Sequence, residues 1–421
     1  MYACGIDFGT SNSTIALAEN GRVRQLAIDP GSAVGFASPT LLYFGEDTEP
    51  VFGSSAVSDY LESEMEGRLI QSIKKYLPSK SFDGTWINGQ KRSIEALVGG
   101  YLRYLKVNAD AAAGEPVRSV VLGRPARFHL RPELDLLAQT RLEAAARIAG
   151  FEDIHFQIEP IAAARRFEQS LDGDVLCFVG DFGGGTSDFT VIRLSPDRIG
   201  QTDRTGDVLG VAGVPVGGTD FDARIMQHHV LPHFGHNTRY RPLHQWMTIP
   251  TGIHHAITRW HTACLASTRT NLDTLKKMMR TAVDSDGLGR LHRLLEEGWF
   301  YVLFQSVEAV KIALSAQESA DLVFSVPGID IRQSITRGAF EDSIGEEVRR
   351  IEQCVDTMLA DLGLSADDIS VAFLTGGSSK IPLIHQLFAE RFSQRIVTQD
   401  AFTSVGTGLG VEAAARTAQG S

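Results

Sequence analysis

The sequence predicts an α/β protein with two similar lobes that face each other across a cleft. The prediction rests on one pattern that occurs twice: a short apolar strand ending in an aspartate, then small or hydroxyl residues, then a returning strand. The first copy covers residues 2–18 and the second covers residues 176–194. Because the copies lie in different halves of the chain, they predict that the two halves are built alike.

Both predicted hairpins have tips that suit an anion and a metal ion. Gly183, Gly184 and Gly185 can adopt positive φ angles and bring backbone N–H groups close to a phosphate. Asp7 and Asp181 supply carboxylates that can hold Mg²⁺ or its bound waters. A polyphosphate with its metal would therefore lie between the two lobes. Each of these turns alone is more often an ordinary hairpin turn, and it is the second copy of the pattern that favours a phosphate site.

Composition and charge narrow the class of protein. The 421 residues are 43% hydrophobic and 22% charged, and the net charge is −11, which argues against a general nucleic-acid or anionic-membrane surface. The four cysteines form no CxxC pair and are expected to be buried thiols in a reducing compartment. Neither a signal peptide nor an apolar run of about 18 residues is evident, so the predicted location is the cytoplasm.

In the first half of the chain, apolar spacing and turn residues predict alternating strands and helices. The Asp-Gly and Asn-Gly pairs in residues 82–92 indicate a hairpin, and apolar residues at helical spacing indicate a helix over residues 94–113. Gly150 is placed to end a helix that begins at Glu133. The other predicted elements are strands at 39–44, 118–123 and 154–158, and helices at 51–62 and 161–170.

The second half continues with longer helices. Apolar residues repeat every three or four positions from Thr336 to Leu362, which predicts one long amphipathic helix. The Pro327-Gly328 pair separates two alternating strands. The other predicted elements are helices at 221–231, 298–317 and 402–418, a strand at 371–374, and a helix opened by residues 376–382.

Two charged positions outside the hairpins are candidates for catalysis. Lys74, in the basic pair Lys74-Lys75, could neutralise a γ-phosphate, although a solvated basic pair is the simpler interpretation. Glu159 follows a strand and precedes Pro160, so it could order a metal-bound water or serve as a base. A carboxylate at the first turn of a helix is also favoured by the helix dipole alone.

Three further stretches are candidates for binding the remainder of a nucleotide. Residues 217–220 form a Gly-Gly-Thr-Asp loop that enters a helix, where free N–H groups can hold an anion. Glu308, Lys311 and Ser315 share one helix face, which a simple ion pair between Glu308 and Lys311 would also explain. Residues 376–380, Gly-Gly-Ser-Ser-Lys, open another helix with glycines that permit the close approach of a flat ring.

The stretch 228–290 is less regular and contains eight of the twelve histidines. His229 and His233 have a spacing that permits a shared metal ion, but no HExxH motif or cysteine pair accompanies them. Solvated or core histidines are therefore the favoured interpretation of this segment.

Six of these stretches, taken in order, resemble the ATPase domain of the seventy-kilodalton heat-shock (DnaK-like) chaperones, within the actin, hexokinase and heat-shock ATPase superfamily. The resemblance extends from Gly5 to about Gly408, nearly the whole chain. It includes Glu159-Pro-Ile-Ala-Ala-Ala and Asp181-Phe-Gly-Gly-Gly-Thr-Ser-Asp. It implies an actin-like fold in which two lobes, each on a five-stranded mixed sheet of the ribonuclease-H-like type, enclose ATP or ADP with Mg²⁺.

The resemblance also assigns roles to particular residues. Catalysis would fall to Lys74, Glu159, Asp181 and Thr186. Asp7, Asp181 and Glu159 would hold the metal, the last two through water. The nucleotide-binding residues would be Gly9, Thr10, Ser11, Asn12, Gly183, Gly184, Gly185, Thr186, Gly217, Gly218, Thr219, Glu308, Lys311, Ile312, Ser315, Gly376, Gly377, Ser378 and Lys380.

The chain departs from the chaperone pattern in two respects. Ile312 and Lys380 stand where the chaperones carry arginines on either side of adenine, which weakens planar stacking. No linker and no peptide-binding domain follow the last predicted helix, so the chain resembles the shorter stand-alone bacterial proteins of the YegD type.

The expected protein is a monomeric, slow ATP-hydrolysing switch with an unidentified protein partner. A non-hydrolysing nucleotide sensor, an actin-like filament protein and a small-molecule kinase are the alternatives.

The same resemblance predicts the domain boundaries. Lobe I would cover residues 1–174, with a peripheral subdomain at 38–112. Lobe II would cover residues 175–402, with a mostly helical peripheral subdomain at 219–335. Residues 403–421 would form a helix that returns to lobe I and a frayed tail.

Overall fold

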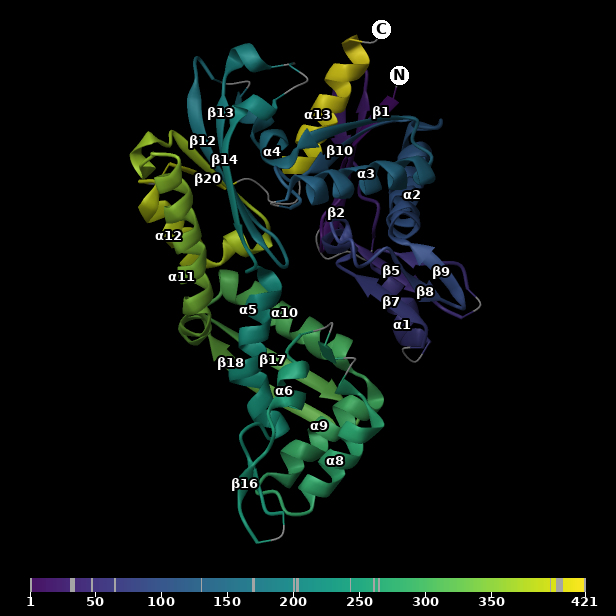
Figure 1. The fold of residues 1–421 in the computed structure, drawn as a ribbon, viewed down its shortest axis with the longest axis vertical. Coiled ribbons are helices and arrows are strands. Elements are labelled where there is room, and N and C mark those ends of the chain that lie inside the picture. Colours follow the sequence, from purple (N-terminus) through teal and green to yellow (C-terminus); the bar gives the residue numbers. More distant parts are fainter. Residues whose placement is uncertain are drawn as a thin grey trace. The chain divides into compact units, whose positions relative to one another are not determined.

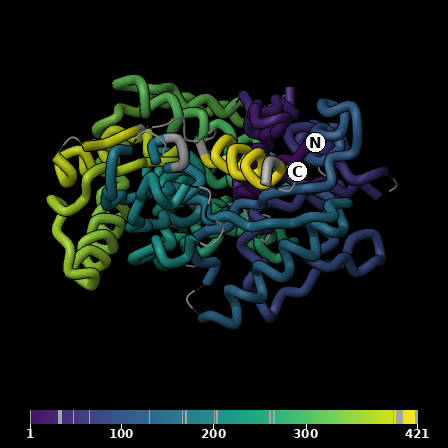
Figure 2. The backbone as a smooth tube through the Cα atoms, turned by 90° about the horizontal axis from the view of Figure 1, so that it is seen from above, coloured from purple at the N-terminus to yellow at the C-terminus, as the bar shows by residue number. Residues whose placement is uncertain are grey.

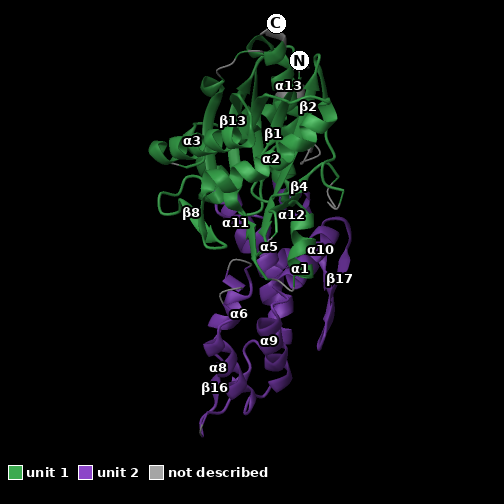
Figure 3. Ribbon diagram, turned by 90° about the vertical axis from the view of Figure 1, so that its right-hand side faces the viewer, with its two compact units in different colours: residues 1–213, 354–379, 388–421 green, residues 214–353, 380–387 purple. Residues whose placement is uncertain are grey.

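The computed structural model describes residues 2–30, 35–46, 48–63, 66–129, 131–168, 171–199, 201, 204–242, 244–259, 262–263, 266–393, 395–398 and 404–419. Two compact units are present (Figure 3): unit 1 comprises residues 1–213, 354–379 and 388–421, and unit 2 comprises residues 214–353 and 380–387. The lobe boundaries expected from the sequence stay a prediction.

The first large sheet of unit 1 contains the N-terminal hairpin. Its strand order is β11-β10-β1-β2-β3, with β4 paired to β2 (Figure 1). β1 is parallel to β10 and antiparallel to β2, with Asp7 opposite Thr14. The strands are β1 (Tyr2–Asp7), β2 (Asn12–Glu19), β3 (Arg22–Gln25), β4 (Ser38–Pro39), β10 (Ser119–Arg124) and β11 (Asp153–Ile158).

The second large sheet of unit 1 repeats this plan around the central hairpin. Its order is β14-β13-β12-β19-β20, and β12 is parallel to β19 and antiparallel to β13. Thus β12 corresponds to β1, β13 to β2 and β19 to β10, which confirms the predicted fold class of two similar five-stranded mixed sheets. The strands are β12 (Val175–Phe182), β13 (Ser187–Leu194), β14 (Val208–Val214), β19 (Val371–Thr375) and β20 (Ile396–Thr398).

Helices cover the first sheet on both sides. α2 (Ile94–Ala113) and α3 (Pro132–Ala149) pack together and bury apolar residues against the β-strands. α2 begins where the Ser93 hydroxyl accepts the Ala96 N–H, and it ends at Gly114, whose φ is +75°. Gly150, with φ +103°, ends α3 as the sequence predicts.

The C-terminal helix α13 (Ser404–Gln419) returns to the N-terminal strand (Figures 1 and 2). A Cβ atom on Gly5 would lie 2.2 Å from the Gly410 nitrogen, and one on Gly408 would lie 1.9 Å from the Ala162 carbonyl oxygen. Gly5 of β1 and Gly408 of α13 are therefore required for the close packing of α13 on β1 and on α4 (Glu159–Glu168).

A smaller group of elements adjoins the first sheet. The predicted hairpin at 82–92 is confirmed, with Asn88 and Gly89 both at positive φ as a type I′ turn requires. The predicted helix at 51–62 is correct only in its second part, because Val51 and Phe52 pair with β5 before the helix begins. The elements are β5 (Leu41–Phe44), β6 (Val51–Phe52), α1 (Ser55–Glu62), β7 (Arg68–Gln71), β8 (Gly84–Ile87) and β9 (Gln90–Ser93).

Unit 2 is mostly helical. The helix predicted at 221–231 starts earlier, as α5 (Gly218–Ile225), and continues as a wider π-helical turn over Met226–Val230. Pro327 and Gly328 connect β17 to β18 as predicted. The other elements are β15 (Arg239–Tyr240), β16 (Met247–Thr248), α6 (Gly252–Ala256), α8 (Arg269–Met279), α9 (Ser285–Glu297), α10 (Phe300–Ala316), β17 (Ser319–Val326) and β18 (Ile329–Thr336).

Two helices have residues in both units. α11 (Arg337–Asp361) enters unit 1 at Cys354, and α12 (Pro382–Arg391) enters it at Phe388, which packs against Phe178, Phe182 and Phe189. Among the residues that the structure describes, no helix is both long and apolar enough to span a membrane.

Candidate functional site

The acidic ends of the two repeated hairpins lie in unit 1 and interact electrostatically. Asp7 is the last residue of β1, and Asp181 lies near the end of β12 opposite Asp188 of β13. The Thr375 hydroxyl, at the end of β19, donates a hydrogen bond to Asp181 Oδ1 at 3.1 Å. The corresponding ends of two equivalent strands thus supply the acids of one site.

The tips of the hairpins approach each other closely. A Cβ atom on Gly184 would lie 2.1 Å from Ser11 Oγ, and one on Gly185 would lie 2.0 Å from Lys75 Nζ. The Gly183 N–H donates to the Thr186 carbonyl at 2.9 Å, and the Thr186 hydroxyl donates to Asp188 Oδ2 at 2.9 Å. The second tip thus places glycine backbone next to the Ser11 hydroxyl and the Lys75 ammonium group, and a side chain at position 184 or 185 would have to displace them.

Lys74 and Glu159 form an ion pair beside the two aspartates. Lys74 Nζ donates to Glu159 Oε1 at 2.9 Å, and both side chains are about nine-tenths buried, at 12% and 10% exposed. Glu159 is the first residue of α4, directly after β11. The structure therefore brings Asp7, Lys74, Glu159 and Asp181 together in unit 1, as the sequence predicts.

The backbone around Lys74 is defined by an unusual conformation before it and by hydrogen bonds after it. Ser72, just before the short turn Ile73–Tyr76, has φ +55°, an unusual conformation for a residue other than glycine. After this turn, Arg141 Nη1 of α3 lies within 2.8–3.3 Å of the carbonyl oxygens of Tyr76, Leu77, Ser79 and Phe82. Arg141 thereby satisfies the carbonyls of an irregular segment and holds it against α3.

More carboxyl groups than amines interact in this site. Burial, reinforced by the Glu159 carboxylate, raises the pKa of Asp7 to about 8, and it raises the pKa of Asp181 to about 7. For Lys74, burial favours the neutral amine, but the carboxylates of Glu159, Asp7 and Asp181 outweigh it and raise the pKa.

These carboxyls could hold a hard divalent cation only with water or phosphate completing its ligands, because the described residues contain no cluster of three or more His, Cys, Asp or Glu that could hold a metal ion alone. Oxygen ligands from carboxylates are what Mg²⁺ prefers, and the raised pKa values of Asp7 and Asp181 are the signature of buried carboxyls that a nearby cation would ionise. Asp7, Asp181 and Glu159 are the residues that could hold the ion directly or through water.

The buried carboxyls predict a fall in stability with pH. Folded Asp7 and Asp181 retain their protons up to about pH 8 and about pH 7, whereas the unfolded groups lose them near pH 4. In protein free of metal and nucleotide, each group should lower the free energy of unfolding by up to about 1.4 kcal/mol per pH unit across that window.

Urea unfolding at a series of pH values measures this slope. Asp7→Asn should flatten it and stabilise the protein at pH 8, whereas Asp321→Asn, on an exposed edge of β17, should leave it unchanged. If the slope is the same in Asp7→Asn as in the wild type, Asp7 is already ionised in the folded protein.

The remaining predicted binding residues are divided between the two units. Gly376, Gly377 and Ser378 belong to unit 1, and Gly376 has φ +85° with no room for a Cβ atom beside the Phe182 carbonyl. The members in unit 2 are Gly217, Gly218, Thr219, Glu308, Lys311, Ile312, Ser315 and Lys380.

Within unit 2, Lys311 does not form the simple pair with Glu308 considered above. Its ammonium group contacts Asp222 Oδ2 at 2.9 Å and donates to the Gly218 carbonyl at 3.3 Å. Burial raises the pKa of Asp222 to about 6, although Lys311 opposes the shift. At the start of α5, Asp220 Oδ2 accepts the Gly217 N–H at 2.9 Å.

The i,i+4 histidines His229 and His233 both contact the side-chain amide of Gln333. His233 Nε2 lies 2.8 Å from Gln333 Oε1, and His229 Nδ1 lies 3.4 Å from the nitrogen of the same amide. The described part of the chain contains no cluster of three or more His, Cys, Asp or Glu suited to a metal ion. His261 lies outside the described residues.

Sequence reasoning missed three residues of this site. Lys75 contacts the second glycine turn, Asp188 accepts the Thr186 hydroxyl, and Thr375 binds Asp181. Lys75 belongs to the basic pair and Asp188 to the second hairpin, so both were visible in the sequence. Thr375 is 194 positions from its partner Asp181, so no local pattern points to it.

Comparison with known proteins shows which family the chain belongs to. The family model described as "Hsp70 protein" matches residues 3–241 and 298–416, well over half of the chain. The chain belongs to the Hsp70 protein family. The matched range includes every predicted site residue, and the family's nucleotide-binding domains generally bind ATP or ADP with Mg²⁺ and hydrolyse ATP. Residues 242–297 lie outside the match.

Several relatives carry the name "Chaperone protein DnaK". Those of Elusimicrobium minutum and Metamycoplasma hominis are each 26% identical over 97% of this chain, and that of Deinococcus deserti is 26% identical over 91%. These alignments cover 57%, 58% and 55% of the respective relatives, so the chain spans less than two thirds of their length. This relation covers the nucleotide-binding part of DnaK.

Proposed function

We propose that this Hsp70 protein is an ATP-binding molecular switch that hydrolyses ATP slowly. The observation that carries the proposal is the meeting of the two acid-ended hairpins, with glycine backbone at the tips and the Lys74–Glu159 pair beside them. The phosphates would lie against Gly9 to Asn12 and Gly183 to Thr186, where N–H groups and hydroxyls can donate to them.

Each charged residue has a distinct proposed role in this switch. Lys74 would stabilise negative charge on the γ-phosphate, and Glu159, Asp181 and Thr186 would orient the attacking water. When bound by Asp7 and Asp181, Mg²⁺ would supply positive charge for the phosphate oxygens. One preorganised contact of this kind typically contributes about 3–4 kcal/mol to the transition state.

The adenosine would be held by the helix α10 and the loop that begins at Gly376. On α10, Glu308 and Ser315 would contact the nucleoside. Ile312 of α10 is 61% exposed and Lys380 is exposed, so neither is buried in the core of its unit. Because neither can stack as an arginine does, we expect weaker preference for adenine than a pair of arginines would give.

The output of the switch would be conformational. Hydrolysis would change the relative stability of two forms and so regulate a surface for a protein partner, as expected of a chaperone or a chaperone-related regulator of the YegD type. We propose that it acts as a monomer in the cytoplasm, where buried thiols such as Cys4 and Cys177 stay reduced.

A second candidate function is a nucleotide sensor without turnover, which the exposed Ile312 and Lys380 favour. Isothermal titration calorimetry with ATP, ADP and GTP, with and without Mg²⁺, together with a phosphate-release assay, distinguishes the candidates. The switch predicts magnesium-dependent binding of ATP and ADP and slow release of phosphate. Binding without release supports the sensor, and no binding of any nucleotide contradicts both.

A further inference from the structure

A basic stretch of the chain has a charge opposite to that of the whole protein. Residues 228–283 contain seven lysines and arginines and one aspartate, in addition to eight histidines, whereas the whole chain has 40 lysines and arginines against 51 acids. The stretch crosses the end of the family match at residue 241, and the unmatched residues 242–297 contain seven lysines and arginines against five acids. None of the predicted nucleotide-binding residues lies in residues 228–283.

The β15–β16 hairpin of unit 2 presents an aromatic residue among these bases. Tyr240 pairs with Met247 in the antiparallel register, and the guanidinium carbons of Arg239 and Arg241 lie 5.7 and 6.0 Å from the ring centre of Trp246. Trp246 is 51% exposed and Met247 is 50% exposed. Trp246 and Met247 are adjacent in the hairpin, so they form a contiguous exposed patch rather than a single exposed side chain, and such patches often mark interaction sites.

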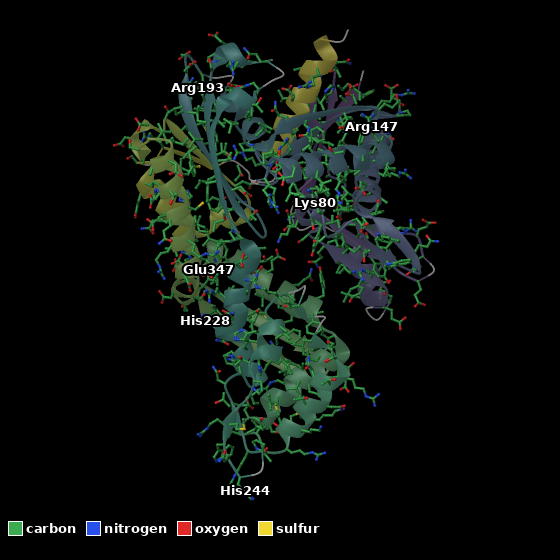
Figure 4. The ribbon with its side chains drawn as sticks, in the orientation of Figure 1. Lys80, Arg147, Arg193, His228, His244 and Glu347 are labelled. Atoms are coloured by element: carbon green, nitrogen blue, oxygen red, sulfur yellow. The ribbon has the colours of Figure 1, made fainter. Side chains whose placement is uncertain are left out.

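Residues at the end of α8 extend this surface. The Val283 N–H donates to the Arg239 carbonyl at 2.8 Å, and the Arg241 N–H donates to Thr281 Oγ1 at 3.2 Å, so residues 280–283 lie alongside β15. Val283 is 67% exposed. The basic–aromatic surface consists of Arg239, Arg241, Trp246, Met247, Arg280 and Val283. Figure 1 shows β16 at the end of unit 2, and Figure 4 labels the neighbouring His244 there.

Within the described ranges, the arginines of this surface are not paired with acids: Arg239, Arg241 and Arg280 form no ion pair with a carboxylate. The adjacent Asp284 carboxylate accepts the Gly287 N–H at 2.8 Å at the start of α9, so three arginines face one nearby acid and the surface keeps a net positive charge. The surface thus combines exposed positive charge with exposed tryptophan and methionine, the composition typical of energetically important interface residues.

We propose that the basic–aromatic surface binds an acidic segment of a partner protein, with an apolar side chain of that segment against Trp246 and Met247. A long polyanion such as RNA fits less well, because the rest of the chain is strongly acidic and would repel phosphates beyond the surface.

An array of short random-sequence peptides, probed with the full chain, tests this proposal. The strongest binders should be rich in Asp and Glu and contain an aromatic or aliphatic residue. Fluorescence anisotropy of such a peptide should show roughly tenfold weaker binding to Arg239→Glu/Arg241→Glu and to Trp246→Ala. The affinity should also fall as salt rises from about 50 to about 300 mM.

The matched control is Arg269→Glu, an exposed arginine at the opposite end of α8, roughly 16 Å along the helix from its last residue. This variant should bind the peptide as the wild type does, and thermal unfolding verifies that all variants are folded. The proposal is overturned if no peptide binds, if binders lack acidic residues, or if the charge reversal has no effect. Tighter binding of poly(U) RNA or phosphatidylserine vesicles than of every peptide also overturns it.

Discussion

Replacing Lys74 with alanine should reduce the rate of ATP hydrolysis by roughly 10²–10³ while nucleotide still binds. Lys74 Nζ is the buried cation beside Glu159, and the carboxylates of Asp7 and Asp181 act on it electrostatically. If this ammonium acts on charge that develops during phosphate transfer, its loss raises the barrier more than it weakens ground-state binding. Single-turnover hydrolysis and calorimetry on the same preparation separate the two effects.

Lys80→Ala is the matched control for this experiment. Lys80 is exposed, follows the same segment and is labelled in Figure 4, so its loss should leave turnover unchanged. An unchanged rate in Lys74→Ala would remove Lys74 from the mechanism. A loss of ATP binding equal to the loss of rate would instead make it a binding residue.

Replacing Arg204 with methionine should destabilise unit 1 by about 3–5 kcal/mol. Arg204 is 1% exposed and Glu168 is fully buried, and the guanidinium donates to both Glu168 oxygens at 2.6 and 3.1 Å. Its Nε also contacts Asp207. Removal of the arginine takes away the cation that pairs with the buried Glu168 carboxylate, which is the costly outcome for a buried pair, whereas Asp207 keeps its contact with Arg198.

The buried Arg204–Glu168 pair is connected to the candidate site through helix α4. Glu168 is the last residue of α4, whose first residue is Glu159. Urea unfolding measures the loss in the free energy of unfolding. The double variant Arg204→Met/Glu168→Gln should recover part of that loss, because the Glu168 carboxylate is no longer buried without Arg204. Arg118→Ala, in a pair where both partners are more than 60% exposed, should cost less than about 1 kcal/mol. An equally small effect at Arg204 would show that water reaches Glu168.

The sequence predicts much of this fold because its signals are local. Strand alternation, Asn88-Gly89 and the glycines that end α2 and α3 are each determined by a few neighbouring residues. The hairpin repeat also carries the acids Asp7 and Asp181, so the centre of the site follows from the same pattern. The start of α5 and the π-helical turn after Ile225 were not predicted, since tertiary packing decides where such a helix changes its pitch.

The supporting interactions could not be predicted, because they join residues far apart in sequence. Arg141 binds carbonyls about sixty positions away, and Arg204 pairs with Glu168 from 36 positions away. An isolated arginine in either context gives no indication of its partner. The same applies to Gln333, which holds the two histidines whose spacing permitted a metal ion.

We propose that the two acid-ended, glycine-tipped hairpins hold one magnesium triphosphate. A crystal structure of the chain with Mg²⁺ and a non-hydrolysable ATP analogue tests this directly. We expect phosphate oxygens at the N–H groups of Gly9 to Asn12 and Gly183 to Thr186, with the metal between Asp7 and Asp181. A triphosphate bound elsewhere, or a metal that contacts neither aspartate directly nor through water, would contradict it.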